Sequence, residues 1–227
     1  MARQYSAFLI PMASCLIFAG SAHAASSYQI NTVSPSSHSF IQVAKKGLSD
    51  EEKKKIAKGA ENFINTMGKR ATGFLGATNM SQAQKEKEFR KLLKTSFDMT
   101  TIGRFSLGRY WNASTAVQRK EYLRLFESMV VEVYAQRFND YQGQTLEVRG
   151  SRPEGKSDTV VNSFIVDNSG NEFRVDWRVR YKKGVYKVVD VIIEGVSMSV
   201  TQRSDFSSVI QRGGGDVQVL LAHLKTE

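Results

Sequence analysis

A run in which apolar and charged residues alternate without a miss is the strongest constraint on the fold of this chain. Residues Phe173 to Tyr181 read Phe-Arg-Val-Asp-Trp-Arg-Val-Arg-Tyr. Successive side chains of a β-strand point to opposite faces, so a period of two predicts a strand with one buried face and one solvated face. Turn-forming residues stand on both sides, at 168–171 and 182–184. The run therefore predicts a strand that tight turns join to a neighbour on each side.

The neighbouring segments also have the composition of strands. Thr145 to Arg149 reads as extended chain, and Thr159 to Asp167 is rich in Val, Phe and Ile. Val185 to Ile193 is apolar on both faces, which is typical of a central or covered strand. Together with the alternating run, these segments predict a four-stranded antiparallel sheet in meander order.

Before residue 143 the apolar residues recur at helical spacing instead. Ser49-Asp50-Glu51-Glu52 has the pattern of a capping box and predicts the start of a first helix that continues past Met67. A second helix is expected from Ser81, and a short third helix from Thr100 to Leu107. The strongest pattern starts near Thr115 and predicts one long helix that Gly143 ends.

Two short helices, Thr201 to Ile210 and Asp216 to Leu224, are expected after the strands, with Gly213-Gly214-Gly215 as the turn between them. Helices followed by strands place the chain in the α+β class, with several amphipathic helices packed against the antiparallel four-stranded meander. The apolar faces of the sheet and of the long helix fit an ordinary packed core. They fit the wall of a ligand cavity equally well, because both use the same side chains.

The N-terminus has the features of an export signal. Arg3 precedes an apolar region from Ala7 to Gly20, and Ala22-His23-Ala24 offers small residues at a cleavage site. This arrangement predicts a secretory signal peptide cleaved after Ala24, and it is too short for a membrane-spanning helix. A lipoprotein signal at Met12-Ala13-Ser14-Cys15 is the alternative, but the apolar run continues past that cysteine.

The expected organisation is therefore a signal peptide over residues 1–24, a Ser-rich disordered leader over 25–48, and one domain over 49–227. Removal of the signal reduces the 32 Lys and Arg residues to 31, against 22 Asp and Glu, which leaves a net charge of +9. In an exported protein this charge either favours anionic surfaces such as phospholipid headgroups or maintains solubility.

Residues for catalysis and metal binding are scarce. Cys15 is the only cysteine, and only His38 and His223 follow the signal. Neither an HExxH, a GxSxG nor a calcium-loop pattern occurs, so we expect no catalytic residue, no metal and no cofactor. Asp190 and Glu194 share one strand face; they suit either a general acid with a raised pKa or, with more support, structural hydrogen bonds at the strand-to-helix junction.

Two separate motifs resemble those of the MlaC family of periplasmic phospholipid carriers, also called the toluene-tolerance auxiliary family. The first contains Phe97-Asp98, Leu107-Gly108, Trp111 and Gln118-Arg119, and leads into the long helix. The second contains Asp190-Val191, Glu194-Gly195-Val196-Ser197, Arg203 and Phe206. The chain departs from the family pattern at Tyr186, Val189 and Met198, where Trp, Tyr and Leu are usual. These exchanges affect the fit of a ligand more than the fold.

The resemblance implies a soluble periplasmic carrier that holds a phospholipid by its acyl chains in a cleft between sheet and helices. Its implied partners are an inner-membrane ABC transporter complex and an outer-membrane lipoprotein–porin complex, and its implied role is maintenance of outer-membrane lipid asymmetry. Arg or Lys near the mouth of the cleft would offset the phosphate charge. The expected lipid-binding residues are Phe105, Leu107, Phe126, Val130, Tyr134, Phe164, Val175, Trp177, Val179, Val188, Ile192 and Val196.

Three other functions remain open from the sequence. The ligand of a carrier could be another lipid, such as a hopanoid. A periplasmic hydrolase that uses Asp190 and Glu194 would need those carboxylates for a reaction. A protein-interaction or chaperone module would bind a polypeptide instead of a lipid.

Overall fold

The computed structural model describes residues 49–155 and 157–226, which fall in one compact unit of the chain. The predicted signal peptide and leader, residues 1–48, lie outside the described residues. The helices are α1 (Asp50–Leu75), α2 (Gln82–Ser96), α3 (Met99–Leu107), α4 (Tyr110–Ala113), α5 (Ala116–Ala135), the 3₁₀ helix η1 (Phe138–Asp140), α6 (Met198–Arg212) and α7 (Val217–His223). The strands are β1 (Thr145–Glu154), β2 (Asp158–Val166), β3 (Glu172–Lys182), β4 (Val185–Ile193) and β5 (Val196–Ser197).

Three helices begin with the same arrangement of side chains. Ser49 accepts a hydrogen bond from the backbone N–H of Glu52, whose carboxylate accepts one from the N–H of Ser49. Ser81 begins α2 and Thr115 begins α5 in the same way, each with a Gln three residues later. These reciprocal bonds satisfy backbone donors that a helix start leaves unpaired. The capping box predicted at Ser49 is thus confirmed.

The long helix predicted from Thr115 to Gly143 is shorter than expected. α5 ends at Ala135, and the chain continues into η1, where Phe138 is buried. The ring of Phe138 packs edge-on against Phe74 of α1 and Phe89 of α2, at centroid distances of 6.2 and 5.4 Å. Tertiary packing of this ring therefore turns the chain toward α1 and α2, although the sequence keeps its helical spacing.

The sheet has the predicted meander order with one additional strand. Its order is β1-β2-β3-β4-β5, and all neighbouring pairs are antiparallel. The prediction of four strands was incomplete, because Val196 and Ser197 pair with the end of β4. The turn before them, Glu194-Gly195, has positive φ at both residues (48° and 82°), as a two-residue type I′ hairpin requires.

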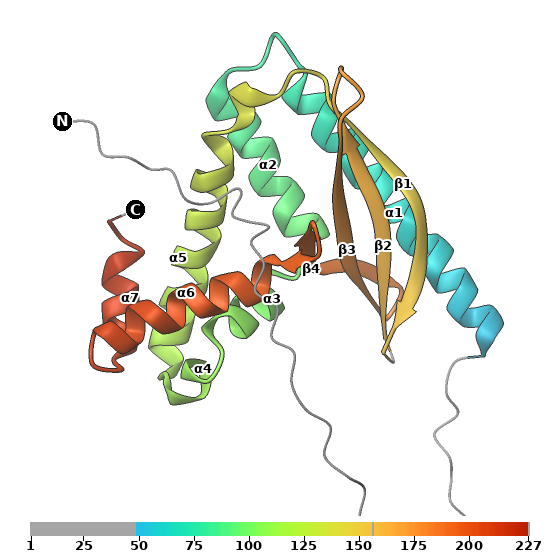
Figure 1. The fold of residues 1–227 in the computed structure, drawn as a ribbon. Helices are drawn as coiled ribbons and strands as arrows, with labels where there is room; N and C mark the ends of the chain where they lie inside the picture. The colour runs from blue at the N-terminus through green and yellow to red at the C-terminus, as the bar shows by residue number, and fades with distance from the viewer. Residues whose placement is uncertain (1–48, 156, 227) are drawn as a thin grey trace, which may run out of the picture. The chain divides into compact units, whose positions relative to one another are not determined.

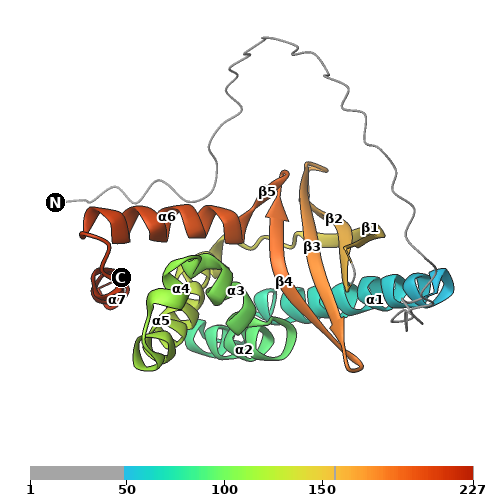
Figure 2. The same cartoon turned by 90° about the horizontal axis from the view of Figure 1, so that it is seen from below.

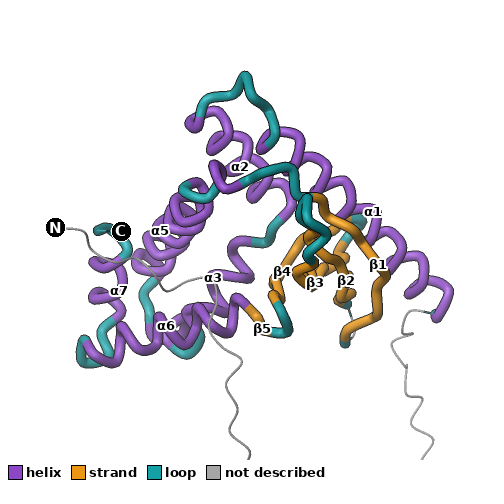
Figure 3. Tube along the Cα trace, turned by 45° about the horizontal axis from the view of Figure 1, so that its top comes forward, coloured by secondary structure: helices purple, strands orange, loops and turns teal. Residues whose placement is uncertain are grey.

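β4 separates two groups of helices. α1 packs along one face of the sheet, and α5, α6 and α7 gather beyond the β4 end of the sheet (Figure 1; Figure 2, seen from below). α2 and α3 run next to β4, where Phe97 forms a parallel bridge to Val188 and the N–H of Asp98 donates to the Val188 carbonyl at 2.9 Å. The tube view shows β4 between the helical group and β1 to β3 (Figure 3). The prediction that Val185–Ile193 is a central or covered strand is confirmed in the second sense, because β4 pairs with β3 along its length, with β5 only at Ile192 and Ile193, and is otherwise covered at Val188 by Phe97 and Asp98.

The buried apolar side chains form two clusters. The helical cluster joins α3 to α7, and its buried members are Leu107, Tyr110, Tyr122, Leu125, Phe126, Phe206, Ile210, Val217, Leu220, Leu221 and Leu224. The sheet-side cluster joins α1 and α2 to the sheet, and its buried members are Ala60, Ile64, Met67, Phe74, Leu92, Val161, Val179 and Val188. The turn predicted at Gly213-Gly214-Gly215 lies between α6 and α7 as expected, and holds them against one another.

Candidate functional site

The two apolar clusters differ in how completely they exclude water. The helical cluster has 11 buried members and 7 partly buried ones, whereas the sheet-side cluster has 8 buried members and 11 partly buried ones. An apolar side chain that stays partly exposed contributes less to stability than one that is fully buried. Opening the sheet-side cluster to admit a ligand therefore gives up less buried apolar surface than opening the helical cluster.

Aromatic rings occupy much of this interface between sheet and helices. The ring of Phe97, directly after α2, packs edge-on against Trp177 of β3 at 6.5 Å, and Phe63 of α1 stacks on Tyr186 of β4 at 6.0 Å. The indole N–H of Trp177 donates to the Ser163 hydroxyl at 2.9 Å. The lipid cleft predicted between sheet and helices remains a prediction, because the protein's own side chains fill this interface.

The structure divides the predicted lipid-binding residues among four places. Trp177, Val179 and Val188 lie in the sheet-side cluster, and Val175 is buried on the same face of β3. The helical cluster contains Leu107 and Phe126, with Val130 packed against it. Phe105, Tyr134 and Val196 are exposed, at 43%, 41% and 55% of their surface. Phe164 and Ile192 face the opposite side of the sheet, paired with Arg174 and Asp176.

Several half-buried residues of the sheet-side cluster were absent from the predicted set. They include Phe63 on α1, Phe89 on α2, Phe97 directly after α2, and Tyr186 on β4. The helical spacing of Phe89 and Phe97 did mark them as facing a core. Spacing alone does not say which helix covers which face of a sheet, so their place beside Trp177 could not be read from the sequence.

The opposite face of the sheet carries ion pairs. The Asp158 carboxylate, almost fully buried, accepts hydrogen bonds from Arg180 at 2.7 and 2.9 Å and from Arg178 at 2.8 Å. Burial raises the pKa of Asp158, but the hydrogen bonds from Arg180 and Arg178 outweigh burial and leave this pKa below its usual value. Asp176 forms a similar bidentate pair with Arg174.

The carboxylates considered for catalysis hold the strand-to-helix junction. Asp190 accepts hydrogen bonds from the Val191 N–H, the Ser197 hydroxyl and the Ser199 N–H, at 2.9, 2.6 and 3.1 Å. Glu194 accepts one from the backbone N–H of Arg174 at 2.6 Å, across the β3–β4 edge. These bonds confirm the structural interpretation of both residues.

An arginine-lined cavity of about 460 Å³ opens between α3, α4, α6 and the end of β3. Its lining residues are Thr101, Arg104, Phe105, Gly108, Trp111, Asn112, Arg180 and Arg203. We call it the arginine cavity. Three guanidinium groups and two aromatic rings make it suited to an anionic group attached to an apolar one.

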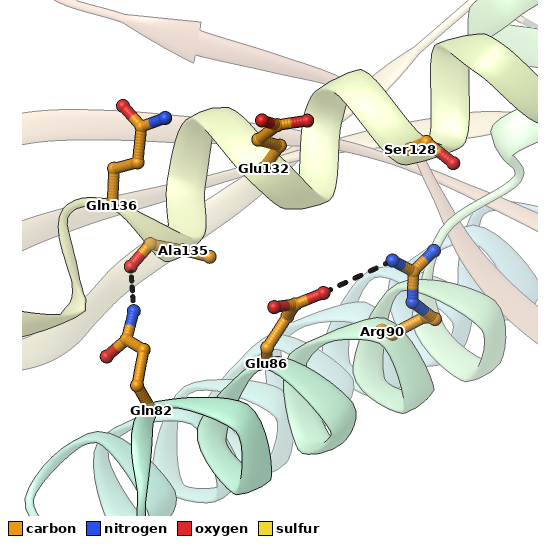
Figure 4. A pocket seen from close by; sticks show the side chains of 7 residues that line it. All are labelled: Gln82, Glu86, Arg90, Ser128, Glu132, Ala135 and Gln136. Carbon is orange, nitrogen blue, oxygen red and sulfur yellow. Dashed lines mark hydrogen bonds and ion pairs between the residues drawn. The ribbon is translucent and has the colours of Figure 1, made fainter.

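A second cavity, of about 380 Å³, lies between α2 and α5. Figure 4 shows Gln82 of α2 donating to the Ala135 carbonyl of α5, and Glu86 paired with Arg90 at 3.3 Å. Glu132 and Gln136 line the α5 side. Because carboxylates and amides dominate this wall, it does not suit acyl chains.

The described part of the chain contains no group of three or more His, Cys, Asp or Glu residues placed to hold a metal ion. Within residues 49–155 and 157–226, no helix is both long and apolar enough to cross a bilayer.

Comparison with known proteins identifies related chains. The family model described as MlaC protein matches residues 68–226. The intermembrane phospholipid transport system binding protein MlaC of Haemophilus influenzae is 24% identical over 117 residues, 50% of this chain and 55% of that protein. The toluene tolerance protein ttg2D of Pseudomonas putida is 22% identical over 109 residues, 48% of this chain and 51% of that protein. The matches thus span about half the length of these curated relatives.

A solved structure shares the fold. The phospholipid-binding protein from Ralstonia solanacearum, determined in complex with a phospholipid, has a TM-score of 0.64 with this chain at 24% sequence identity. The similarity covers 74% of this chain and 95% of the Ralstonia chain. It establishes the common α+β architecture of the two proteins.

Proposed function

Because the chain belongs to the MlaC protein family, we propose that it is a carrier that binds a phospholipid by its acyl chains. One structural observation carries this proposal: the sheet-side cluster has more partly buried apolar members than buried ones. Acyl chains that enter between the sheet and α1 and α2 would replace contacts that are already incomplete. The Haemophilus relative's name and the Ralstonia complex support phospholipid as the ligand class.

The proposed setting is the periplasm, reached through the signal peptide predicted over residues 1–24. There the carrier would move lipid between an outer-membrane lipoprotein–porin complex and an inner-membrane ABC transporter complex, and so maintain outer-membrane lipid asymmetry. The name of the Haemophilus relative supports an intermembrane transport role.

The energetics of such a ligand favour release driven by a partner. Each buried methylene contributes about 0.8 kcal/mol, so two acyl chains contribute on the order of 20 kcal/mol before ordering costs. That total approaches the limit for non-covalent binding. Spontaneous release should therefore be slow, and a docking partner that opens the interface would set the delivery rate.

Native mass spectrometry of protein exported by a host cell and purified without detergent tests the proposal. We expect a one-to-one adduct of phospholipid mass, whose headgroup and chain lengths organic extraction then identifies. An adduct with the mass of a hopanoid would show that the ligand is this alternative lipid and not a phospholipid. A clean apo mass that persists after incubation with phospholipid vesicles would contradict the carrier function.

A pair of matched variants tests where the acyl chains bind. Ala71 of α1 is half-buried in the sheet-side cluster, whereas Ala222 of α7 is exposed. We expect Ala71→Phe to fill the space that the chains need and to lose the lipid adduct, with its circular dichroism spectrum unchanged. Ala222→Phe should load like the wild type. Equal loading of both variants would place the acyl chains elsewhere.

A further inference from the structure

The two sequence motifs, about ninety residues apart, meet at the arginine cavity. Gly108 and Trp111 come from the first motif and Arg203 from the second, and all three line the cavity. β3 adds Arg180, so three separate parts of the chain place a guanidinium at one opening. None of the acyl-chain contacts proposed above explains this convergence.

The guanidinium groups of Arg104 and Arg203 rest against aromatic rings. That of Arg104 lies 6.0 Å from the Trp111 ring centre, and that of Arg203 lies 5.6 Å from the Phe105 ring centre. Gly108 also approaches Arg203 closely, since a Cβ atom at this glycine would stand 2.7 Å from the Arg203 Nε atom. The rings and the bare glycine backbone therefore position both cations before any ligand arrives.

No carboxylate of the described residues neutralises the charge of these two arginines. Among residues 49–155 and 157–226, Arg104 and Arg203 form no ion pair with a carboxylate. Arg180 does have a partner in Asp158, but it shares that single carboxylate with Arg178. The cavity therefore carries an excess of positive charge.

Asp98, whose charge acts on Arg180, already accepts hydrogen bonds within the chain. Asp98 caps α3, where it accepts hydrogen bonds from the N–H and the hydroxyl of Thr101 at 2.9 and 2.6 Å. Thr101 itself lines the cavity. No described acidic residue lines the cavity, so an anion from outside the chain is the group that its charge favours.

The cavity also lies close to the sheet-side cluster. Phe97, which packs on Trp177, precedes the cavity residue Thr101 by four positions. Phe97 and Asp98 join α2 to α3 outside both helices, and four residues of chain span at most about 14 Å. That span is shorter than a phospholipid molecule, which extends across about half of a 40–45 Å bilayer. Guanidinium forks match the oxygens of phosphates in bidentate geometry. We propose that the arginine cavity binds a phosphoryl oxyanion and that, on the proposed carrier function, this is the headgroup phosphate of the bound lipid.

Competition between two lipids with the same acyl chains tests this site. Lipid-free full-length protein is incubated with vesicles that contain equal amounts of a phosphatidylglycerol and the matching diacylglycerol, and native mass spectrometry gives the loaded ratio. We expect the wild type to prefer the phospholipid at least tenfold. The double variant Arg104→Gln/Arg203→Gln should load both lipids about equally, at unchanged total occupancy. Arg212→Gln, an exposed arginine at the end of α6, is the matched control and should keep the preference.

Each other outcome has a distinct meaning. A double variant that still prefers phospholipid tenfold overturns the arginine cavity as the headgroup site, while the carrier function stands. If the wild type loads neither lipid, the carrier function itself fails, and the headgroup assignment fails with it. A titration with inorganic phosphate and glycerol phosphate separates the sources. If the wild type binds these free anions and the double variant keeps the preference for phospholipid, the cavity is assigned to free phosphate instead.

Discussion

At the scale of single residues, Gly108 excludes a side chain for two reasons. Its φ of +58° lies in the left-handed region that other residues adopt with strain, and a Cβ atom would collide with Arg203. We expect Gly108→Ala to lower the free energy of unfolding by about 1–2 kcal/mol and to reduce the preference for phospholipid, because Arg203 must move. Urea denaturation and the lipid competition measure the two effects.

Gly73 of α1 is the control for this prediction. No atom lies within 4 Å of a Cβ built there, and its backbone is helical. Gly73→Ala should therefore leave lipid preference unchanged and raise the free energy of unfolding by up to about 1 kcal/mol. Equal effects of the two substitutions would show that the contact between Gly108 and Arg203 has no special role.

Asp158 gives a prediction that depends on pH. Its carboxylate holds Arg178 and Arg180 on the polar face of the sheet, so we expect Asp158→Asn to lower the free energy of unfolding by about 2 kcal/mol at pH 7. The value lies below the roughly 3–5 kcal/mol for breaking a fully buried pair because both arginines are partly exposed. Denaturant titrations at several pH values measure it.

The sign of the pH dependence follows from the lowered pKa of Asp158. A lowered pKa in the folded state stabilises the protein above the unfolded value of about 3.9, and this stabilisation disappears as the pH falls through the folded value. The difference between wild type and Asp158→Asn should thus be complete at pH 7 and shrink below about pH 4. A constant difference from pH 7 to pH 3 would contradict the ion-pair explanation. Asp140→Asn, at an exposed carboxylate of η1, should have little effect at any pH.

At the scale of helices and strands, local chemistry made many boundaries predictable. Capping side chains mark where α1 and α2 begin, and the alternation at Phe173–Tyr181 marks β3. Other bounds differed from the prediction: β1 continues past Arg149 to Glu154, and α6 begins at Met198 instead of Thr201. The early end of α5 and the additional strand β5 have tertiary reasons. The end of α5 depends on where Phe138 packs, and β5 depends on the pairing of Val196 with Ile193. The spacing of apolar residues in the sequence predicts neither contact.

The candidate site was less predictable than the elements that form it. Trp177 and Val188 were expected at the interface and lie there, whereas Phe164 faces the other side of the sheet. A strand pattern gives two faces but does not say which one the helices cover. The arginine cavity requires α3, β3 and α6 to meet, and the sequence marked its motif residues Gly108 and Arg203 without showing that they touch.

The unequal closure of the two clusters predicts which helices respond to lipid. Amide hydrogen exchange measured with and without bound phospholipid should slow most in α1 and α2, because the acyl chains would complete the sheet-side cluster. α7 should change least, since its apolar residues are buried in the helical cluster. A slowing confined to α5 and α7 would place the ligand in the helical cluster and contradict the proposed site.

At the scale of the whole molecule, the chain has a formal net charge of +10. We expect it to bind vesicles that contain anionic lipid at low salt and to lose at least tenfold in affinity between about 0.05 and 0.5 M salt, because the ions screen the attraction. Vesicle sedimentation over a salt series measures this. Zwitterionic vesicles are the control, and equal binding to both, without salt dependence, would exclude an electrostatic contribution to docking.

The chain has two tryptophans, and the structure gives each a different neighbourhood. Trp177 lies among the rings of the sheet-side cluster, and Trp111 lines the arginine cavity beside Arg104. Their fluorescence therefore contains one optical reporter for the acyl chains and one for the headgroup. With Trp111→Phe, the remaining emission follows Trp177 alone. Stopped-flow mixing of this variant and the wild type with lipid would then time the arrival of the two ends of the ligand separately.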